Sequence, residues 1–369
     1  MNSNSITNAP YPRLVVDLKK LRHNIDVVLD NCSQANISVC GAIKGFNGLP
    51  KAVEEFAEAG FSQLGTSRMR TIKELTMLGI QAKYLLLRVP MLSEADDVVK
   101  YANVSLNSDI QVIRALNDAA AKAGTSHEVI LMSDLGDLRE GFWDQEELLD
   151  CAEVVEKELD NIVLKGVGTN LGCYGSIKPT VTKMNELISI AELVEKRIGR
   201  RLEIISGGAT SSYVLVLNQS MPERINHLRI GEGILNNYDL PEIWGLDIEN
   251  MYQDVFTFEA EVIEVRDKPS HPVGEICIDS FGRKPEYTDR GIRRRALLAA
   301  GKLDFALNDK IFPQMEGATV IGSSSDHMIL DIEDSKEEVK VGDIVTFHVS
   351  YPSMMYLSND KYVNVIYNL

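Results

Sequence analysis

The sequence of 369 residues is short of basic side chains. Its 38 Lys and Arg stand against 54 Asp and Glu, which gives a formal net charge of −16. A protein that binds nucleic acid needs a basic surface to displace counterions from phosphates, and a helix that lies on a membrane needs basic residues as well. We therefore expect neither a nucleic acid nor a membrane as a partner.

Cysteines are also few, and none of them forms a C-x-x-C pair. The chain has five, Cys32, Cys40, Cys151, Cys173 and Cys277. An odd and scattered set indicates neither a disulfide framework nor a thiolate zinc site, so we expect no metal. The N-terminal segment lacks the basic and apolar regions of a signal peptide, and no apolar run is long enough for a transmembrane helix. We expect a cytoplasmic protein.

What the sequence does contain is the pattern of a parallel α/β protein. With 44% hydrophobic and 25% charged residues it is an ordinary globular chain. Short apolar runs alternate with amphipathic stretches, as in βα units. We expect strands at residues 13–17, 37–43, 63–66, 84–88, 104–107, 129–133, 163–169, 202–206 and 226–230.

The last eight of these strands predict a closed (β/α)₈ TIM-type barrel within residues 13–235. The leading strand is left over and is free to pair elsewhere. An open, doubly wound sheet is the alternative, although such a sheet usually has fewer strands.

Residues 236–369 have a different sequence pattern. Runs that are rich in β-branched residues, or in which apolar and polar residues alternate, lie at 257–265, 318–321, 327–331 and 341–349. We expect a C-terminal, mostly β domain, joined to the barrel by a linker at 236–250.

Polar residues follow the predicted barrel strands, at the end where such barrels carry their chemistry. Lys44 leaves an apolar strand for the barrel mouth, where partial desolvation would lower its pKa and make it a candidate Schiff-base nucleophile. The loops 206–212 and 229–233 combine glycines with hydroxyl side chains, which suits a phosphate. A lysine nucleophile beside a phosphate cradle is what pyridoxal 5′-phosphate (PLP) requires.

The chain resembles the alanine racemase-like, fold-type III PLP enzymes, and within them the alanine/ornithine racemase group. The segments that carry the resemblance are 18–24, 42–44, 134–141, 168–171, 205–211, 226–232, 291–293 and 324–331. The resemblance implies an isomerase that racemises an amino acid, ornithine first and lysine or another amino acid otherwise. It also implies a homodimer with shared active sites.

The resemblance assigns roles to single residues. Lys44 matches the lysine that binds the cofactor covalently and then serves as one of two acid/base groups at Cα. Arg229 matches the arginine that faces the pyridine nitrogen, and because a guanidinium only donates, the ring nitrogen stays unprotonated. The other cofactor contacts implied are Arg139 at the phenolic oxygen, Asn170 at the ring's flank, and Ser206, Thr210, Ser211 and Gly231 around the phosphate.

The second acid/base group is left open. Relatives use a tyrosine of the β domain, but the corresponding stretch 271–282 contains none. His327, next to Asp326, is the first candidate because its ordinary pKa lies near neutrality, and both residues would come from a second copy of the chain. Asp279 and Tyr287 are the alternatives.

Two further points stay open at this stage. Met132 stands where many relatives have a modifiable lysine, so Arg139 must be held in another way. A diamino acid needs an acidic partner, for which Glu232, Asp279, Glu275 and Asp304 are candidates.

Two other functions compete with racemisation. One is a PLP-dependent D-amino-acid aldolase or dehydratase reaction, and the other is a non-catalytic PLP-binding role. The β domain argues against the latter, because single-barrel relatives of that kind lack it.

Overall fold

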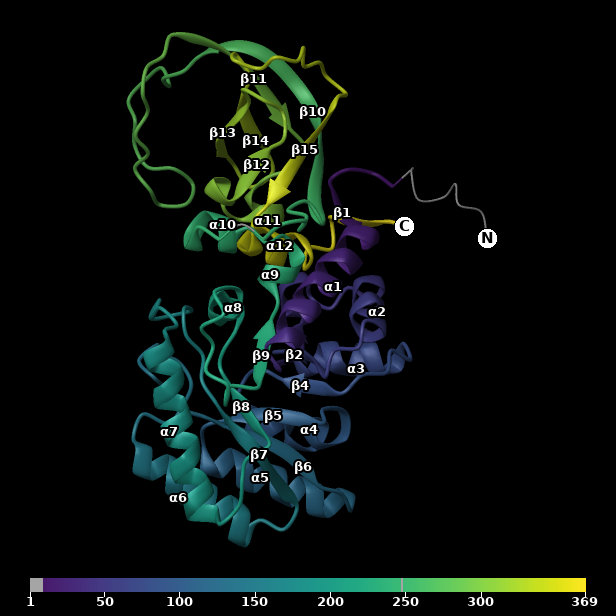
Figure 1. Ribbon diagram of the computed structural model, residues 1–369. Coiled ribbons are helices and arrows are strands. Elements are labelled where there is room, and N and C mark those ends of the chain that lie inside the picture. Colours follow the sequence, from purple (N-terminus) through teal and green to yellow (C-terminus); the bar gives the residue numbers. More distant parts are fainter. Residues whose placement is uncertain (1–8, 247) are drawn as a thin grey trace. The chain divides into compact units, whose positions relative to one another are not determined.

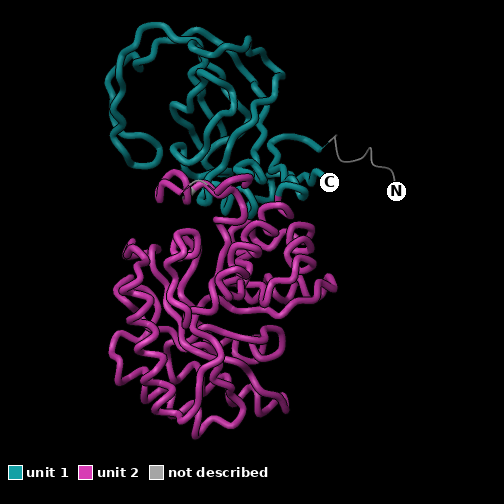
Figure 2. The backbone as a smooth tube through the Cα atoms, viewed as in Figure 1, with its two compact units in different colours: residues 1–20, 252–369 teal, residues 21–251 magenta. Residues whose placement is uncertain are grey.

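The computed structural model describes residues 9–246 and 248–369 of a chain that divides into two compact units (Figure 2). Residues 21–251 form one of them, which we name the barrel unit. Residues 1–20 together with 252–369 form the other, which we name the β unit. The segment 236–250, expected as a linker, contains the helix α10 (Asp239–Trp244) and belongs to the barrel unit.

Eight parallel strands of the barrel unit close into a barrel in the order in which they occur along the chain (Figure 1). They are β2 (Ser38–Ala42), β3 (Gln63–Thr66), β4 (Tyr84–Leu86), β5 (Val104–Asn107), β6 (His127–Met132), β7 (Ile162–Gly168), β8 (Ile204–Ser206) and β9 (His227–Ile230). Pairing of β9 with β2 completes the closure and sets Cys40 opposite Arg229. The predicted TIM-type barrel is confirmed, and the open sheet is excluded because a closed barrel has no edge strands.

One helix leads into β2, and the other helices connect consecutive barrel strands or follow the last one (Figure 1). They are α1 (Leu18–Gln34), η1 (Ile43–Phe46), α2 (Pro50–Glu58), α3 (Met69–Met77), η2 (Leu92–Glu94), α4 (Ala95–Tyr101), α5 (Ile110–Ala123), α6 (Gln145–Glu158), α7 (Val181–Ile198), α8 (Thr210–Leu217) and, after β9, α9 (Glu232–Leu235). Local sequence sets several of their ends. Asp109, Asp144 and Thr180 accept backbone N–H groups at the starts of α5, α6 and α7, and Gly124 and Gly199 end α5 and α7 with positive φ.

The interior of the barrel is packed with apolar side chains. Cys40, Leu85, Val104, Leu106, Ile130 and Met132 form one buried cluster. Burial raises the pKa of the Cys40 thiol to about 12, so this cysteine is packing material and not a nucleophile. Because the interior is filled in this way, we look for the active site at the C-terminal ends of the strands, where the βα loops begin.

The β unit is built on a single sheet around the long strand β10 (Phe256–Pro269). Its other strands are β1 (Arg13–Asp17), β11 (Ile292–Leu298), β12 (Ile311–Pro313), β13 (Thr319–Ser323), β14 (Met328–Asp331), β15 (Ile344–Val349) and β16 (Asn364–Asn368). The leading strand β1 pairs with β10 and β16. Phe258 packs against Phe305 and Phe347 in the core of this unit. Three short helices, α11 (Lys302–Phe305), η3 (Asn308–Lys310) and α12 (Tyr351–Leu357), interrupt the strands.

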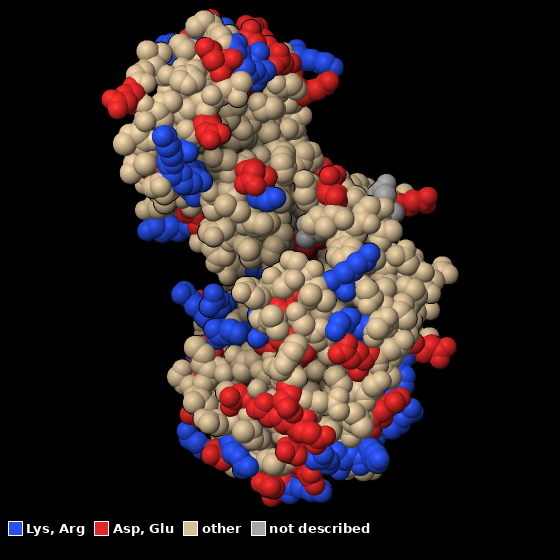
Figure 3. All heavy atoms as spheres, turned by 90° about the vertical axis from the view of Figure 1, so that its left-hand side faces the viewer, with Lys and Arg blue, Asp and Glu red and all other residues tan. Residues whose placement is uncertain are grey.

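Charged side chains of both signs are mixed over the face of the molecule drawn in Figure 3. Ion pairs tie the outer helices together, as where Arg197 of α7 binds Glu146, Asp150 and Glu153 of α6. No helix among the described residues is long and apolar enough to cross a membrane.

Candidate active site

Lys44 lies at the mouth of the barrel, two residues beyond the end of β2. Its side chain is open to solvent, while Ile43 and Gly45 on either side of it are buried. Desolvation by the surrounding protein lowers the pKa of Lys44, and the charges of Arg139 and Arg229 act in the same direction. A lower pKa means a larger fraction of neutral amine, which is the nucleophilic form of a lysine.

Arg229 on β9 is almost completely buried, with 5% of its surface exposed. Its Nη1 donates to Ser206 Oγ, and its Nη2 donates to the carbonyl oxygen of Thr169 at 2.7 Å. Burial lowers the pKa of Arg229. These two bonds come from β8 and from the end of β7, so three neighbouring strands hold the guanidinium in one orientation.

Ser206 is fully buried and connects Arg229 to His227, a residue that the sequence did not bring to attention. Ser206 Oγ lies 2.8 Å from His227 Nδ1. Burial, together with the charge of Arg229, lowers the pKa of His227 to about 3, so the imidazole is neutral. The hydroxyl therefore accepts from Arg229 and donates to His227. The signal for His227 was its spacing, because residues two apart on a strand share a face.

Two glycine-containing loops meet at the start of α8. Gly208 has a φ of +123°, and a Cβ on Gly207 would lie 2.6 Å from Ile225, so both positions require glycine. A Cβ on Gly231 would lie 3.0 Å from the carbonyl oxygen of Ala42. Thr210 Oγ1 faces the backbone nitrogens of Gly231 and Gly233 at 3.4 and 3.3 Å. Backbone N–H groups thus gather where a helix begins, which is an arrangement that binds phosphate.

Ser211, the next residue, secures the loop that follows β7. Its hydroxyl donates to the carbonyl oxygen of Leu171 at 2.7 Å. A Cβ on Gly172 would lie 2.9 Å from Ser211 Cβ, so the two loops are in close contact.

A buried carboxylate clamps the same loop from the other side. Asp137, which is 2% exposed, accepts the backbone N–H groups of four residues of the loop after β7. These are Gly172, Cys173, Tyr174 and Ile177, at 3.1, 3.2, 3.1 and 3.4 Å. Sequence reasoning missed Asp137, and no local signal marked it, because its partners lie 35 to 40 residues away.

Arg139 is held by the residue beside it. Its guanidinium forms a two-bond ion pair with Glu140, with Nη2 and Oε1 2.7 Å apart, and this pair raises the pKa of Arg139. Met132, seven residues earlier, is fully buried in the barrel core. The carboxylate of Glu140 therefore supplies the negative partner of Arg139 that the sequence left unidentified.

Comparison with known proteins agrees with this geometry. The family model described as alanine racemase, N-terminal domain, matches residues 16–237. An ornithine racemase of Acetoanaerobium sticklandii is 38% identical over 353 residues, which cover 96% of this chain and 98% of the relative. A lysine racemase of Thermotoga maritima is 38% identical over 360 residues, which cover 97% and 98%.

Solved structures show the same fold at low sequence identity. The alanine racemase from Streptomyces lavendulae gives a TM-score of 0.75 at 16% identity over 98% of both chains. The D-threonine aldolase from Filomicrobium marinum gives 0.74 at 15% identity, over 98% of this chain and 92% of that one.

The chain belongs to the alanine racemase family. It is accordingly a PLP-dependent amino-acid racemase, which is an isomerase. It combines a parallel barrel with a β unit.

The residues at the mouth of this racemase fit PLP. Two buried polar atoms at the end of β7, Thr169 Oγ1 and Asn170 Nδ2, have no hydrogen-bond partner. They adjoin the backbone carbonyl that binds Arg229. Buried polar groups are normally satisfied, so unpaired atoms beside a glycine cradle and an accessible lysine indicate a place for a polar ligand.

His327 and Asp326 of the racemase lie together in the exposed turn between β13 and β14 of the β unit. The hydroxyl of Ser324 accepts both of their backbone N–H groups, at 3.1 and 3.4 Å. Neither residue belongs to the barrel unit that contains Lys44.

Asp279 and Tyr287, the other candidates for the second base, also belong to the β unit. The Asp279 carboxylate accepts the N–H groups of Phe281 and Arg283, and the bond from Arg283 is the main cause that lowers its pKa. A carboxylate bound in this way is a weak base. Tyr287 is 45% exposed and packs edge-on against the ring of His271.

Of the four carboxylates considered for a substrate amine, Glu232 alone lies in the barrel unit. It is 7% exposed, and its Oε1 accepts the N–H of Tyr238 at 2.7 Å. Asp304 is buried, accepts the N–H of Gly301 and has its pKa raised by burial, whereas Glu275 is exposed.

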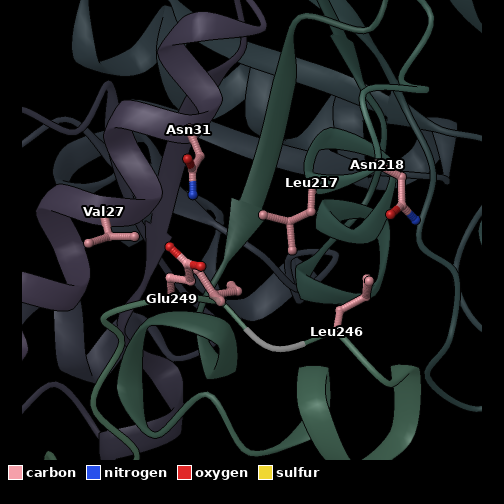
Figure 4. A pocket seen from close by; sticks show the side chains of 7 residues that line it. Val27, Asn31, Leu217, Asn218, Leu246 and Glu249 are labelled. Carbon is pink, nitrogen blue, oxygen red and sulfur yellow. The ribbon is translucent and has the colours of Figure 1, made fainter.

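A cavity of about 320 Å³ lies between α1, the end of α8 and the residues Leu246, Ile248 and Glu249 (Figure 4). Val27, Asn31, Leu217, Asn218, Leu246 and Glu249 line it, and none of the candidate site residues does. Within residues 9–246 and 248–369, no three His, Cys, Asp or Glu side chains come together in a way that could hold a metal ion.

Proposed function

We propose that this racemase interconverts L- and D-ornithine, and that lysine is its next best substrate. One observation carries the racemase chemistry. An accessible lysine with a lowered pKa shares the barrel mouth with a buried arginine and a glycine cradle. The substrate class is supported by the two near-full-length relatives, which are named for the diamino acids ornithine and lysine.

When bound through Lys44, PLP supplies an electron sink that stabilises negative charge at the Cα of the substrate. The chain's part is to hold this group and to move the proton. Backbone N–H groups around Thr210 and Gly231 would hold the phosphate. Asn170 would donate to the flank of the ring from its buried, unpaired amide.

Arg229 would donate to the ring nitrogen. Its bonds to Ser206 and Thr169 fix the plane of the guanidinium, so that the donor is in place before the cofactor arrives. Because an arginine only donates, the ring nitrogen would keep its lone pair unprotonated. This moderates the electron sink and favours simple return of the proton over side reactions.

Arg139 would donate to the phenolic oxygen of PLP. Its guanidinium is oriented by the two-bond ion pair with Glu140, which makes Glu140 a positioning residue.

Lys44 would also act as one of the two acid/base groups. Its ε-amine would hold or release the proton at the barrel mouth. Its lowered pKa makes the ammonium easier to deprotonate, so that the amine can both take up and give back a proton.

We also propose a homodimer in which the turn with Asp326 and His327 from a second copy completes the barrel mouth. Light scattering of the purified protein tests the assembly, and a monomer that racemises at full rate would contradict it. A reducing compartment such as the cytoplasm suits the five cysteines, all of which are free.

The test of the function is racemisation of L-ornithine, L-lysine and L-alanine by the PLP-loaded protein, followed by chiral chromatography. We expect ornithine to give the highest kcat/KM, at least about tenfold above alanine. The Lys44→Ala variant should lose the visible absorbance of the bound cofactor and at least about 10³-fold in rate, since acid/base catalysis alone contributes 10²–10⁴-fold.

The matched control is Lys19→Ala, which removes an exposed lysine of α1 and should change neither quantity. Racemisation of none of the three amino acids, or cofactor absorbance retained by Lys44→Ala, would overturn the proposal.

A further inference from the structure

We propose that Cys173 is the second acid/base group of this racemase and acts on the face of Cα opposite to Lys44. The inference rests on the proposed racemase function and names the group that the missing tyrosine left open.

The order of the strands places the two residues on opposite sides of the cofactor cradle. Lys44 follows β2 and Cys173 follows β7, while the phosphate cradle follows β8 and β9. In the closed barrel these strands run β7, β8, β9, β2 around the wall, so the cradle lies between the two loops. A flat cofactor anchored in the cradle would have the Lys44 loop on one side and the Cys173 loop on the other.

The loop that carries Cys173 is held tightly in this position. Asp137 binds four of its backbone N–H groups, including that of Cys173 at 3.2 Å. Gly172 lies against Ser211 at the start of α8, and a Cβ on Gly175 would lie 2.7 Å from the Asp137 backbone. An acid/base group must be held within reach of the atom it serves, and these contacts provide that precision.

Cys173 also lies within electrostatic reach of the three cationic groups of the site. Of the titratable groups around Lys44, Cys173 has the largest electrostatic effect on the pKa of Lys44. It raises this pKa, whereas desolvation lowers it. It acts on Arg139 and Arg229 as well. The thiol therefore lies close enough to all three cationic groups to share the barrel mouth with them.

A second observation indicates that a ligand occupies this corner of the mouth. Thr169 and Asn170, four and three residues before Cys173 on the same loop, hold the buried polar atoms without a partner. Thr169 is completely buried. A ligand that satisfies these atoms lies beside the loop that carries the thiol.

The other four cysteines lack this setting. Cys32, Cys40 and Cys151 are buried, and burial raises their pKa values to about 12. Cys277 is exposed but belongs to the β unit.

The proton transfer balances without any further reagent. In one direction the Cα–H bond breaks, its proton forms an S–H bond with the Cys173 thiolate, and the electron pair stays with Cα. The ammonium of Lys44 then gives a proton to the opposite face and forms the new Cα–H bond. In the reverse direction the two residues exchange roles, and the solvent resets their protons between turnovers.

The experiment compares the PLP-loaded wild type with Cys173→Ala and Cys173→Ser in deuterium oxide. We expect both variants to keep the cofactor absorbance and to racemise at least about 10²-fold more slowly. Deuterium should still enter Cα of one ornithine enantiomer, because Lys44 serves that face, and should no longer enter the other. Cys277→Ser is the matched control and should behave as the wild type.

A measurement independent of turnover uses iodoacetamide on the wild-type protein. We expect it to alkylate Cys173 in the cofactor-free protein, and we expect bound PLP to slow this reaction at least about tenfold. Mass spectrometry of the modified peptide gives both rates, and it applies even if a Cys173 variant fails to fold.

Three results would overturn the inference while leaving the proposed function intact. One is racemisation by Cys173→Ala within about threefold of the wild-type rate. Another is equal loss of deuterium exchange from both enantiomers. The third is one-sided exchange in His327→Asn instead, which would place the second base in the β unit. Failure of the wild type to racemise any amino acid would instead refute the function itself.

Discussion

His127 at the start of β6 is a buried imidazole whose protonation should destabilise the barrel. It is 1% exposed, and its Nε2 lies 2.8 Å from Ser105 Oγ. Ser105 in turn accepts from Asn107 Nδ2 at 2.9 Å, so its own proton goes to the imidazole. The ring is also hydrogen-bonded to the backbone of Ala102. This network suits a neutral histidine.

The magnitude follows from the shift of its pKa. Burial lowers the pKa of His127 from 6.5 to about 4. Because the folded-state pKa lies below the unfolded one, the unfolded state binds more protons between these values, and stability falls as the pH falls from about 7 towards 4. Between pH 7.5 and pH 5 this single group should cost about 2 kcal/mol of the free energy of unfolding.

The assay compares the wild type with His127→Gln in urea unfolding of the cofactor-free protein at both pH values. Tryptophan fluorescence reports on unfolding of the barrel unit, which contains His127, because both tryptophans, Trp143 and Trp244, lie in that unit. The wild type should lose about 2 kcal/mol more than the variant on acidification. His271→Gln, at a half-buried position in the β unit, serves as the control and should lose as much as the wild type.

The variant is expected to be less stable than the wild type at pH 7.5, so only the difference between the two pH values is diagnostic. Equal losses on acidification in the wild type and in His127→Gln, within about 0.5 kcal/mol, would refute the linkage argument.

Three further predictions concern the barrel mouth. Asp137→Asn should lower the free energy of unfolding by about 2–4 kcal/mol and speed amide hydrogen exchange in the loop after β7, because a charged acceptor of four N–H groups is lost; unchanged exchange there would contradict the clamp. Gly208→Ala should weaken PLP binding at least about tenfold in a fluorescence titration, since φ is +123° and the new Cβ meets Ser212, whereas Gly322→Ala has open space and should bind normally. Glu140→Gln should lower kcat/KM for ornithine by about tenfold, with Glu140→Asp less affected, and equal rates in all three proteins would show that Arg139 needs no charged partner.

The barrel could be predicted from the sequence because its strands are short and fully buried. All four residues of Gln63–Thr66 and of Val104–Asn107 are buried, and such runs alternate with helices of clear apolar periodicity. Strand β11 escaped notice because Arg293, Arg294 and Arg295 dominate it, and only its pairing with β10 and β14 makes it a strand.

The site could be predicted only where local sequence carries the chemistry. Lys44 after an apolar strand and the glycines around Ser206 and Arg229 are local features, and the structure places them at the strand ends of one barrel. The side chains that orient these residues could not be predicted from local sequence. His227 acts through Ser206 on a neighbouring strand, and Asp137 acts on a loop 35 residues further along.

The sequence by itself determined the alternation of strands and helices, the lysine and the glycine loops, because each depends on neighbouring residues along the chain. Tertiary structure alone decided which side chains orient them. Closing the barrel brings β7, β8, β9 and β2 together. The hydroxyl of Ser206, the amine of Lys44 and the neighbouring side chains of His227 and Arg229 thereby meet from three segments that lie far apart in sequence. Their burial then sets their protonation, since desolvation depends on what surrounds a group and not on its neighbours in the chain.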